Sequence, residues 1–251
     1  MSPMLVSLIA FAFIFGGALA GMFLCRVLPP HHLSEDSKDI VKLGMGLVGT
    51  MCALVLGLLI ASAKGSYDTQ SGELTEMSAK IVLLDRMFAH YGPETNEARA
   101  TLRSAVERLV DRLWDSGISQ GFQLDPAARS SEALYETVQA LSPKDESQRL
   151  IQSQALSLEL SVGQIRWLMV EQATTPIPKA LVAVMIFWLT VIFLSWGIFA
   201  PRNGTVVATL FVTALSVSSA IFMILEMYTP YTGLIHISSA PLRTALAHLG
   251  Q

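Results

Sequence analysis

A line of hydroxyl side chains precedes a single carboxylate near the end of this chain. Thr205, Thr209, Thr213 and Ser216 recur at spacings of three or four residues, and Glu226 stands just after the same apolar stretch. Residues spaced in this way lie on one face of a helix. Hydroxyl groups inside a membrane favour a bundle interior or a water-filled cavity, so this face could line a polar pathway. The alternative is that each hydroxyl bonds the carbonyl four residues earlier in its own helix.

Two charged residues stand at the ends of apolar stretches, where a charge would meet the membrane edge. Glu226 is either a solvated interfacial carboxylate or, in an oligomer, one copy of an ion-attracting ring. Lys64 is either an interfacial anchor or part of a gate. The chemistry that these residues offer is therefore ion passage.

A stripe of small residues marks another apolar stretch. Gly49, Ala53, Gly57, Ala61 and Gly65 recur every four residues. Small side chains let helix backbones approach closely, which drives helix association in lipid. Two interpretations are open: the stripe packs against a neighbouring span of the same chain, or it lies at a subunit interface or along a pore axis.

Several other kinds of chemistry are not expected. The chain has no nucleophile elbow, triad spacing, phosphate-binding loop or paired carboxylates in a plausible cleft, so we expect no enzyme. Cys25 and Cys52 lie in apolar runs and offer no disulfide framework. The adjacent His31 and His32 cannot readily both ligate one ion, so we expect neither metal nor cofactor. The net charge of −3 argues against a nucleic-acid partner.

The elements that carry these residues are membrane-spanning helices. Of 251 residues, 52% are hydrophobic and 15% charged, against about 25% charged in soluble domains. Four stretches lack Asp, Glu, Lys and Arg: 1–25, 43–63, 180–201 and 203–225. Each reaches the ~20 residues that cross a bilayer as a helix, the open element that satisfies its own backbone there. The sequence predicts an all-α integral membrane protein with four transmembrane helices.

The long connection between the second and third spans has its own helical pattern. Apolar residues recur at alternating spacings of three and four in two seams, typical of packed helices. The first seam comprises Leu74, Met77, Ile81, Leu84, Phe88 and Tyr91. The second comprises Ile151, Ala155, Leu158, Val162, Ile165 and Met169. We expect an antiparallel helical bundle, its seams forming either an intramolecular core or an intersubunit coiled coil.

This pattern predicts four parts. Residues 1–63 hold the first two spans and a short loop, 64–179 a soluble helical domain, 180–225 the last two spans, and 226–251 a tail with a short amphipathic helix. Gly65 and Gly72 weaken the helical pattern between Ala63 and Tyr91 but do not stop it, so the second span is expected to continue as one rod from about Ser34 to Tyr91. The N-terminus, the soluble domain and the tail share one side of the membrane, and the flanking positive charges nearly tie on which side.

Short motifs in the sequence resemble a family. They are Leu33-Ser34, Val41 to Gly46, Ala53 to Leu59, Ala63-Lys64, Tyr67 to Gln70, Leu84 to Arg86, Tyr91 to Glu94, and Ile224 to Glu226 with Pro230 and Gly233. In these motifs the chain is similar to a bacterial family of unknown function called bestrophin-like. The similarity spans most of the chain and is densest from Leu33 to Arg103.

The resemblance implies kinship with bestrophins, pentameric ion channels with two spans, a cytosolic helical region and two more spans. It implies a homo-oligomer in the bacterial inner membrane that conducts inorganic ions, with its helical domain in the cytosol. The second span lacks the bulky aromatic neck of bestrophins, and Glu226 stands alone where they carry an acidic calcium clasp, so calcium gating does not carry over. The alternative is a non-conducting membrane scaffold or sensor whose helical domain docks a partner.

Overall fold

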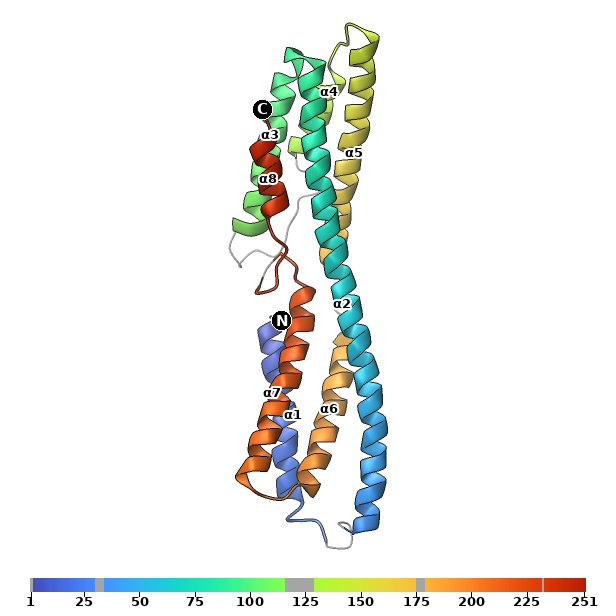
Figure 1. Ribbon diagram of the computed structural model, residues 1–251, viewed down its shortest axis with the longest axis vertical. Coiled ribbons are helices and arrows are strands. Elements are labelled where there is room, and N and C mark those ends of the chain that lie inside the picture. Colours follow the sequence, from blue (N-terminus) through green and yellow to red (C-terminus); the bar gives the residue numbers. More distant parts are fainter. Residues whose placement is uncertain (1, 30–33, 116–128, 175–178, 232) are drawn as a thin grey trace. The chain divides into compact units, whose positions relative to one another are not determined.

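The computed structural model describes residues 2–29, 34–115, 129–174, 179–231 and 233–251, and every regular element in these ranges is a helix (Figure 1). The α-helices are α1 (Pro3–Leu24), α2 (Glu35–Tyr91), α3 (Asn96–Val110), α4 (Arg129–Gln139), α5 (Glu146–Thr174), α6 (Lys179–Phe199), α7 (Gly204–Met227) and α8 (Ala240–His248). A 3-10 turn, η2 (Pro93–Thr95), precedes α3, and a π-helical turn, η3 (Asp111–Asp115), follows it. The predicted all-helical class is confirmed for these residues.

Four of the helices are long and apolar enough to cross a membrane, as predicted. These candidates among the described residues are α1, α2, α6 and α7. Caps fix where two of them begin: Ser2 Oγ accepts a hydrogen bond from the Leu5 N–H (3.3 Å), and Asn203 Oδ1 accepts one from the Val206 N–H (2.8 Å). Such caps satisfy backbone donors that a first helical turn leaves unpaired.

The second candidate span continues far beyond a membrane's thickness. α2 has 57 residues, which corresponds to about 85 Å at 1.5 Å per residue. Ser34 caps its start, because Ser34 Oγ accepts a hydrogen bond from the Ser37 N–H (3.4 Å). The continuous rod predicted up to Tyr91 is thus confirmed.

The chain forms two compact units, which are described separately. The first unit comprises Met1–Ser66 and Pro176–Tyr228, and the second comprises Tyr67–Thr175 and Thr229–Gln251. The first unit therefore holds α1, α6, α7 and the first part of α2. The second unit holds the rest of α2 together with α3, α4, α5 and α8.

In the first unit, α1 packs on both α6 and α7, and its crossing with α6 is a backbone contact. A Cβ atom on Gly21 would overlap the carbonyl oxygen of Leu194, and one on Gly197 would overlap the carbonyl oxygen of Ala18. A Cβ on Gly17 would also lie 3.0 Å from the carbonyl oxygen of Thr190. Glycine at these positions is what allows the two backbones to meet.

The second unit buries the predicted seams in one core. Leu74, Met77, Ile81, Leu84 and Phe88 of α2 are all nearly inaccessible to solvent. Ala155, Ile165 and Met169 of α5 are buried with them, while Leu158 and Val162 pack at the edge of the same cluster. The seams therefore form an intramolecular core rather than leaving their apolar faces for a coiled coil.

A tight turn ends α2 and begins α3. Gly92 has a φ of +129°, in the region that side chains with a Cβ rarely adopt. Thr95 Oγ1 lies 2.6 Å from the Phe88 carbonyl oxygen and 2.7 Å from the Gly92 carbonyl oxygen, so its hydroxyl holds the end of α2. Pro93 cannot continue the helix. Together these residues return the chain antiparallel to α2.

Candidate functional site

The small-residue stripe of α2 has open space beside it. A Cβ atom added to Gly49, Gly57 or Gly65 would have no neighbour within 4 Å among the described residues. Ala53 and Ala61, between these glycines, are exposed. Close packing against another span of the same chain therefore does not account for the stripe. The glycines that do make such a contact are Gly17 and Gly21 on α1 and Gly197 on α6.

A groove of about 640 Å³ in the first unit collects residues from three helices. Gly49 and Ala53 line it from α2, and Thr213 lines it from α7. Its α6 wall includes the aromatic side chains of Phe193 and Trp196 and one hydroxyl group, that of Ser195. The structure thus brings two stripe residues and one hydroxyl of the predicted polar pathway to the same groove, whereas Gly57, Ala61, Thr205, Thr209 and Ser216 do not line it.

The hydroxyl groups of α7 bond their own helix. Thr209 Oγ1 donates to the Thr205 carbonyl oxygen (2.9 Å), Thr213 Oγ1 to that of Thr209 (2.8 Å), and Ser216 Oγ to that of Val212 (2.9 Å). Self-bonding of this kind lets hydroxyl groups persist in an apolar helix without a partner from elsewhere. Thr205, Thr209 and Ser216 are exposed, and Thr213 is half-buried.

The two charged candidates differ in exposure. Glu226 lies in the last turn of α7 and is only 5% exposed, so it is buried within the first unit rather than solvated at its edge. Lys64 on α2 is exposed. Near them, Tyr228 lies with its hydroxyl 3.2 Å from Ser62 Oγ, which ties the end of α7 to α2.

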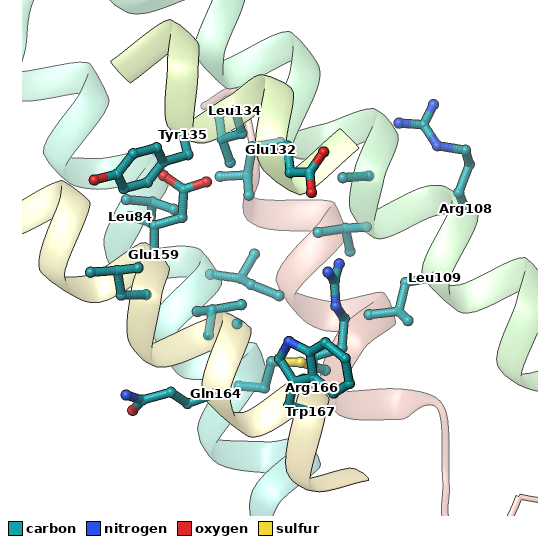
Figure 2. A pocket seen from close by; sticks show the side chains of 18 of the residues that line it. Leu84, Arg108, Leu109, Glu132, Leu134, Tyr135, Glu159, Gln164, Arg166 and Trp167 are labelled. Carbon is teal, nitrogen blue, oxygen red and sulfur yellow. The ribbon is translucent and has the colours of Figure 1, made fainter. Parts of the chain in front are cut away.

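A second cavity, which the sequence did not lead us to expect, lies in the second unit. Its volume is about 520 Å³, and its walls come from α2, α3, η3, α4 and α5. Glu159 of α5 lines it and is 9% exposed. Figure 2 shows the Glu159 side chain extending from α5 toward α4, beside Tyr135. Neither carboxyl oxygen of Glu159 has a hydrogen-bond partner among the described residues, and burial raises the pKa of Glu159 to about 7.

The position of Glu159 could have been found in the sequence. It stands four residues after Ala155 and three before Val162, which are members of the predicted seam. A residue at this spacing shares the buried face of the helix. A search for apolar residues alone passes over the carboxylate among them.

A buried ion pair is the other polar feature of the second unit. Asp85 on α2 accepts two hydrogen bonds from Arg99 on α3, at 2.8 and 2.9 Å. It also accepts one from the Gly250 N–H, at 3.2 Å. Burial acts to raise the pKa of Asp85, but these bonds outweigh it and hold the pKa below its ordinary value. Arg103 donates to the Leu249 carbonyl oxygen (3.0 Å), so the residues after α8 are fixed on α2 and α3.

Metal-binding candidates were also examined. In the ranges that the structure describes, no group of three or more His, Cys, Asp or Glu side chains could hold an ion. His31 and His32 lie outside the described residues.

With four candidate spans and an all-helical fold, this chain is a polytopic helical membrane protein. Its sequence matches the Bestrophin-like domain model over residues 12–242, and the chain belongs to that family. The resemblance noted in the sequence is confirmed.

Two solved structures share the fold. One is a bacterial bestrophin homologue from Klebsiella pneumoniae carrying a leucine-to-threonine mutation, with a TM-score of 0.64 and 14% sequence identity. The other is a membrane protein with a proline-to-alanine mutation, with a TM-score of 0.57 and 15% identity. Each alignment covers 95% of this chain and 99% of the other. A comparison with curated proteins found no match.

Proposed function

We propose that this protein is a homo-oligomeric ion channel of the bacterial inner membrane. The observation that carries the proposal is the open face of α2: a Cβ added to Gly49 or Gly57 would have no neighbour within 4 Å among the described residues, and Ala53 and Ala61 are exposed. A face of glycine and alanine in a span is suited to close approach by another helix or to a narrow water-filled path. Around a symmetry axis, one such face from each subunit forms a pore.

Family membership supports the same conclusion. Bestrophins are pentameric channels, and this chain belongs to the Bestrophin-like domain family and shares the fold of a bacterial bestrophin homologue. By that kinship we propose a pentamer in which α2 of every subunit faces the axis. Residues 64–179 form a soluble helical domain in the cytosol, between the second and third spans. The protein passes ions and carries out no catalysis, and its partners are the bilayer, its own copies and inorganic ions.

In this proposal, the polar residues of α7 tune which ions pass. Thr205, Thr209, Thr213 and Ser216 form a secondary polar path, and copies of Glu226 place carboxylates near one mouth. Charge in a water-poor site acts more strongly than charge on an open surface, because the local dielectric is lower. Glu226 is 5% exposed in one chain, and Lys64 is an exposed cation on the pore-forming helix.

The test is ion flux through purified protein in liposomes, under voltage and in potassium, sodium and chloride gradients. We expect conductance in the wild type, a lower cation conductance in Glu226→Gln, and a further shift toward anions in Glu226→Lys. The shifts should be largest at low salt, where screening is weakest. Absence of flux for every ion and voltage would refute the channel.

A second variant tests whether the open face of α2 lines the pore. Gly57→Leu adds bulk to the open face of α2 and is expected to abolish conductance or reduce the mass of the particle in detergent. Gly16→Leu is the matched control, because Gly16 on α1 is also exposed and has no neighbour within 4 Å. Equal behaviour of the two variants would remove α2 from the pore.

One observation favours a second candidate, a scaffold or sensor that docks a partner. Helix α5 exposes large apolar side chains, among them Leu160 (57%), Trp167 (56%) and Leu168 (50%), of which Leu160 and Trp167 also line the cavity of the second unit. Exposed apolar patches mark interaction surfaces. A protein that gives no flux but stays a defined oligomer would favour this candidate.

A further inference from the structure

The buried carboxyl group of Glu159 has no hydrogen-bond donor among the described residues. Its two oxygens are inaccessible to solvent and accept no hydrogen bond from any described residue. A carboxylate taken out of water without donors is costly, so buried carboxyl groups normally have partners. The other prominent buried acid of this unit, Asp85, shows the usual arrangement, with Arg99 and a backbone N–H as donors.

Glu159 lines a cavity with the dimensions of a ligand site. Its volume of about 520 Å³ lies within the range of about 300–1,000 Å³ typical of small-molecule pockets. Most of the wall is hydrocarbon, and α2 and α3 supply Met77, Ile81, Leu84, Leu102 and Val106. In such a pocket a few polar groups fix the orientation of a ligand while the apolar walls hold its body.

The other charged and titratable groups that face the cavity come from the four elements besides α2 that form its walls. They are Arg108 of α3, Arg112 of η3, Glu132, Tyr135 and Glu136 of α4, and Arg166 of α5. The α2 wall contributes only apolar side chains. Arg108, Arg112, Glu132 and Glu136 are exposed, so water and salt screen them. Arg166 is half-buried and is the less screened cation among these groups. Figure 2 shows Arg108 directed away from Glu159. Glu159 is therefore the acid that meets a ligand in a low dielectric.

We propose that this cavity binds a small organic cation, an ammonium group on an aliphatic or alicyclic body, with Glu159 as its counter-ion. An ammonium carries three donors and no acceptor, so it can satisfy both carboxyl oxygens. The ring of Tyr135 stands beside Glu159 (Figure 2) and offers a face for a cation–π contact. The hydrocarbon body fills the apolar walls. This inference does not rest on ion conduction.

Binding of such a cation depends on pH through Glu159. Only the ionised carboxylate pairs with an ammonium, and the pKa of about 7 makes the ionised fraction rise about tenfold between pH 6 and pH 8. Affinity for the cation should rise by the same factor. A neutral ligand has no such dependence, and a carboxylate ligand should bind more weakly as the pH rises because Glu159 then repels it.

The experiment uses the full chain in lipid nanodiscs and calorimetric titration with three probes of one shape: cyclohexylammonium, cyclohexanol and cyclohexanecarboxylate. At pH 8 we expect cyclohexylammonium to bind the wild type more tightly than the other two probes do. Its affinity for the wild type should be about tenfold weaker at pH 6. Its affinity for Glu159→Gln at pH 8 should be at least tenfold weaker than for the wild type. Glu136→Gln is the matched control, since Glu136 lines the exposed rim of the same cavity, and it should leave the affinity within twofold.

A third variant tests the cavity itself. Gly163 lines it, and a Cβ there would meet nothing within 4 Å, so Gly163→Leu fills space without strain. We expect it to abolish ammonium binding while thermal unfolding stays unchanged. The proposal is overturned if Glu159→Gln or Gly163→Leu binds the ammonium like the wild type. It is also overturned if cyclohexanol or cyclohexanecarboxylate binds more tightly than cyclohexylammonium at pH 8, or if none of the three probes binds.

Discussion

Replacing Asp85 with asparagine should release the C-terminal helix from its bundle. The Asp85 side chain is 2% exposed and that of Arg99 is 19% exposed, and two hydrogen bonds join them. Removing one member of a buried ion pair costs about 3–5 kcal/mol, since the other charge stays buried and unpaired. Asparagine keeps one acceptor oxygen and Arg99 can partly reach water, so we expect a loss near the lower limit, about 3 kcal/mol.

Hydrogen exchange measures this loss where it arises. The Gly250 N–H bonds Asp85, and the carbonyl of Gln251 accepts from Arg99 (3.2 Å), so α8 is held by the same cluster. A loss of about 3 kcal/mol corresponds to about a hundredfold faster exchange. We expect that acceleration for amides of α8 in Asp85→Asn, measured by mass spectrometry on protein in nanodiscs. Amides of α6 provide an internal reference.

A control variant and a pH series sharpen the test. The control is Glu107→Gln, which removes the charge that pairs with Arg103. Both side chains of that pair are about half exposed, so the pair contributes little to stability and hydrogen exchange of the α8 amides should change by less than about threefold. The pKa of Asp85 is lowered on folding, so its contribution is present above the ordinary value of 3.8 and lost as the pH falls through the folded value. If Asp85→Asn exchanges like the wild type at pH 7, the ion pair does not hold α8.

Three further predictions concern other parts of the chain. Gly21→Leu should prevent folding of the first unit, because the side chain would overlap the α6 backbone at Leu194. Size-exclusion chromatography should then show a collapse in the yield of folded protein, whereas the control Gly16→Leu should express normally. Folding raises the pKa of Glu159 from 4.5 to about 7, so the contribution of Glu159 to stability should be fully present below pH 4.5 and fall by about 2–3 kcal/mol as the pH rises to 7. Thermal unfolding of Glu159→Gln should lack this slope, and an equal slope would contradict the assignment. A cysteine at exposed Gln139 should resist an impermeant maleimide in intact cells if the helical domain is cytosolic, and ready labelling would place it outside.

Much of the fold could be predicted because its signals are local. A run without charges such as 43–63 defines a span by length and composition alone. The seam of Leu74, Met77 and Ile81 identifies a buried helix face by its period, and the structure buries all three. Ser34 and Gly92 mark helix ends by the chemistry of caps and turns, and both do so in the structure.

Pairing between distant segments could not be predicted in the same way. The small-residue pattern was noted on α2, where the chain leaves it open, while the backbone contact falls on Gly21 and Gly197, far apart in sequence. The bond from the Gly250 N–H to Asp85 spans 165 positions. Burial of Glu226 likewise depends on what folds around the end of α7, so a single sequence offers no pattern for it.

The hydrogen bonds of the α7 hydroxyl groups determine whether this surface can solvate cations or anions. A carbonyl oxygen has no proton to give, so in each bond from Thr209, Thr213 and Ser216 the hydroxyl proton is committed to the helix. The hydroxyl oxygens then present only lone pairs outward. Such a surface can replace part of the hydration shell of a potassium or sodium ion, whereas chloride would first have to draw a proton away from the backbone. In the proposed channel, this face of α7 would therefore disfavour anions without carrying any formal charge.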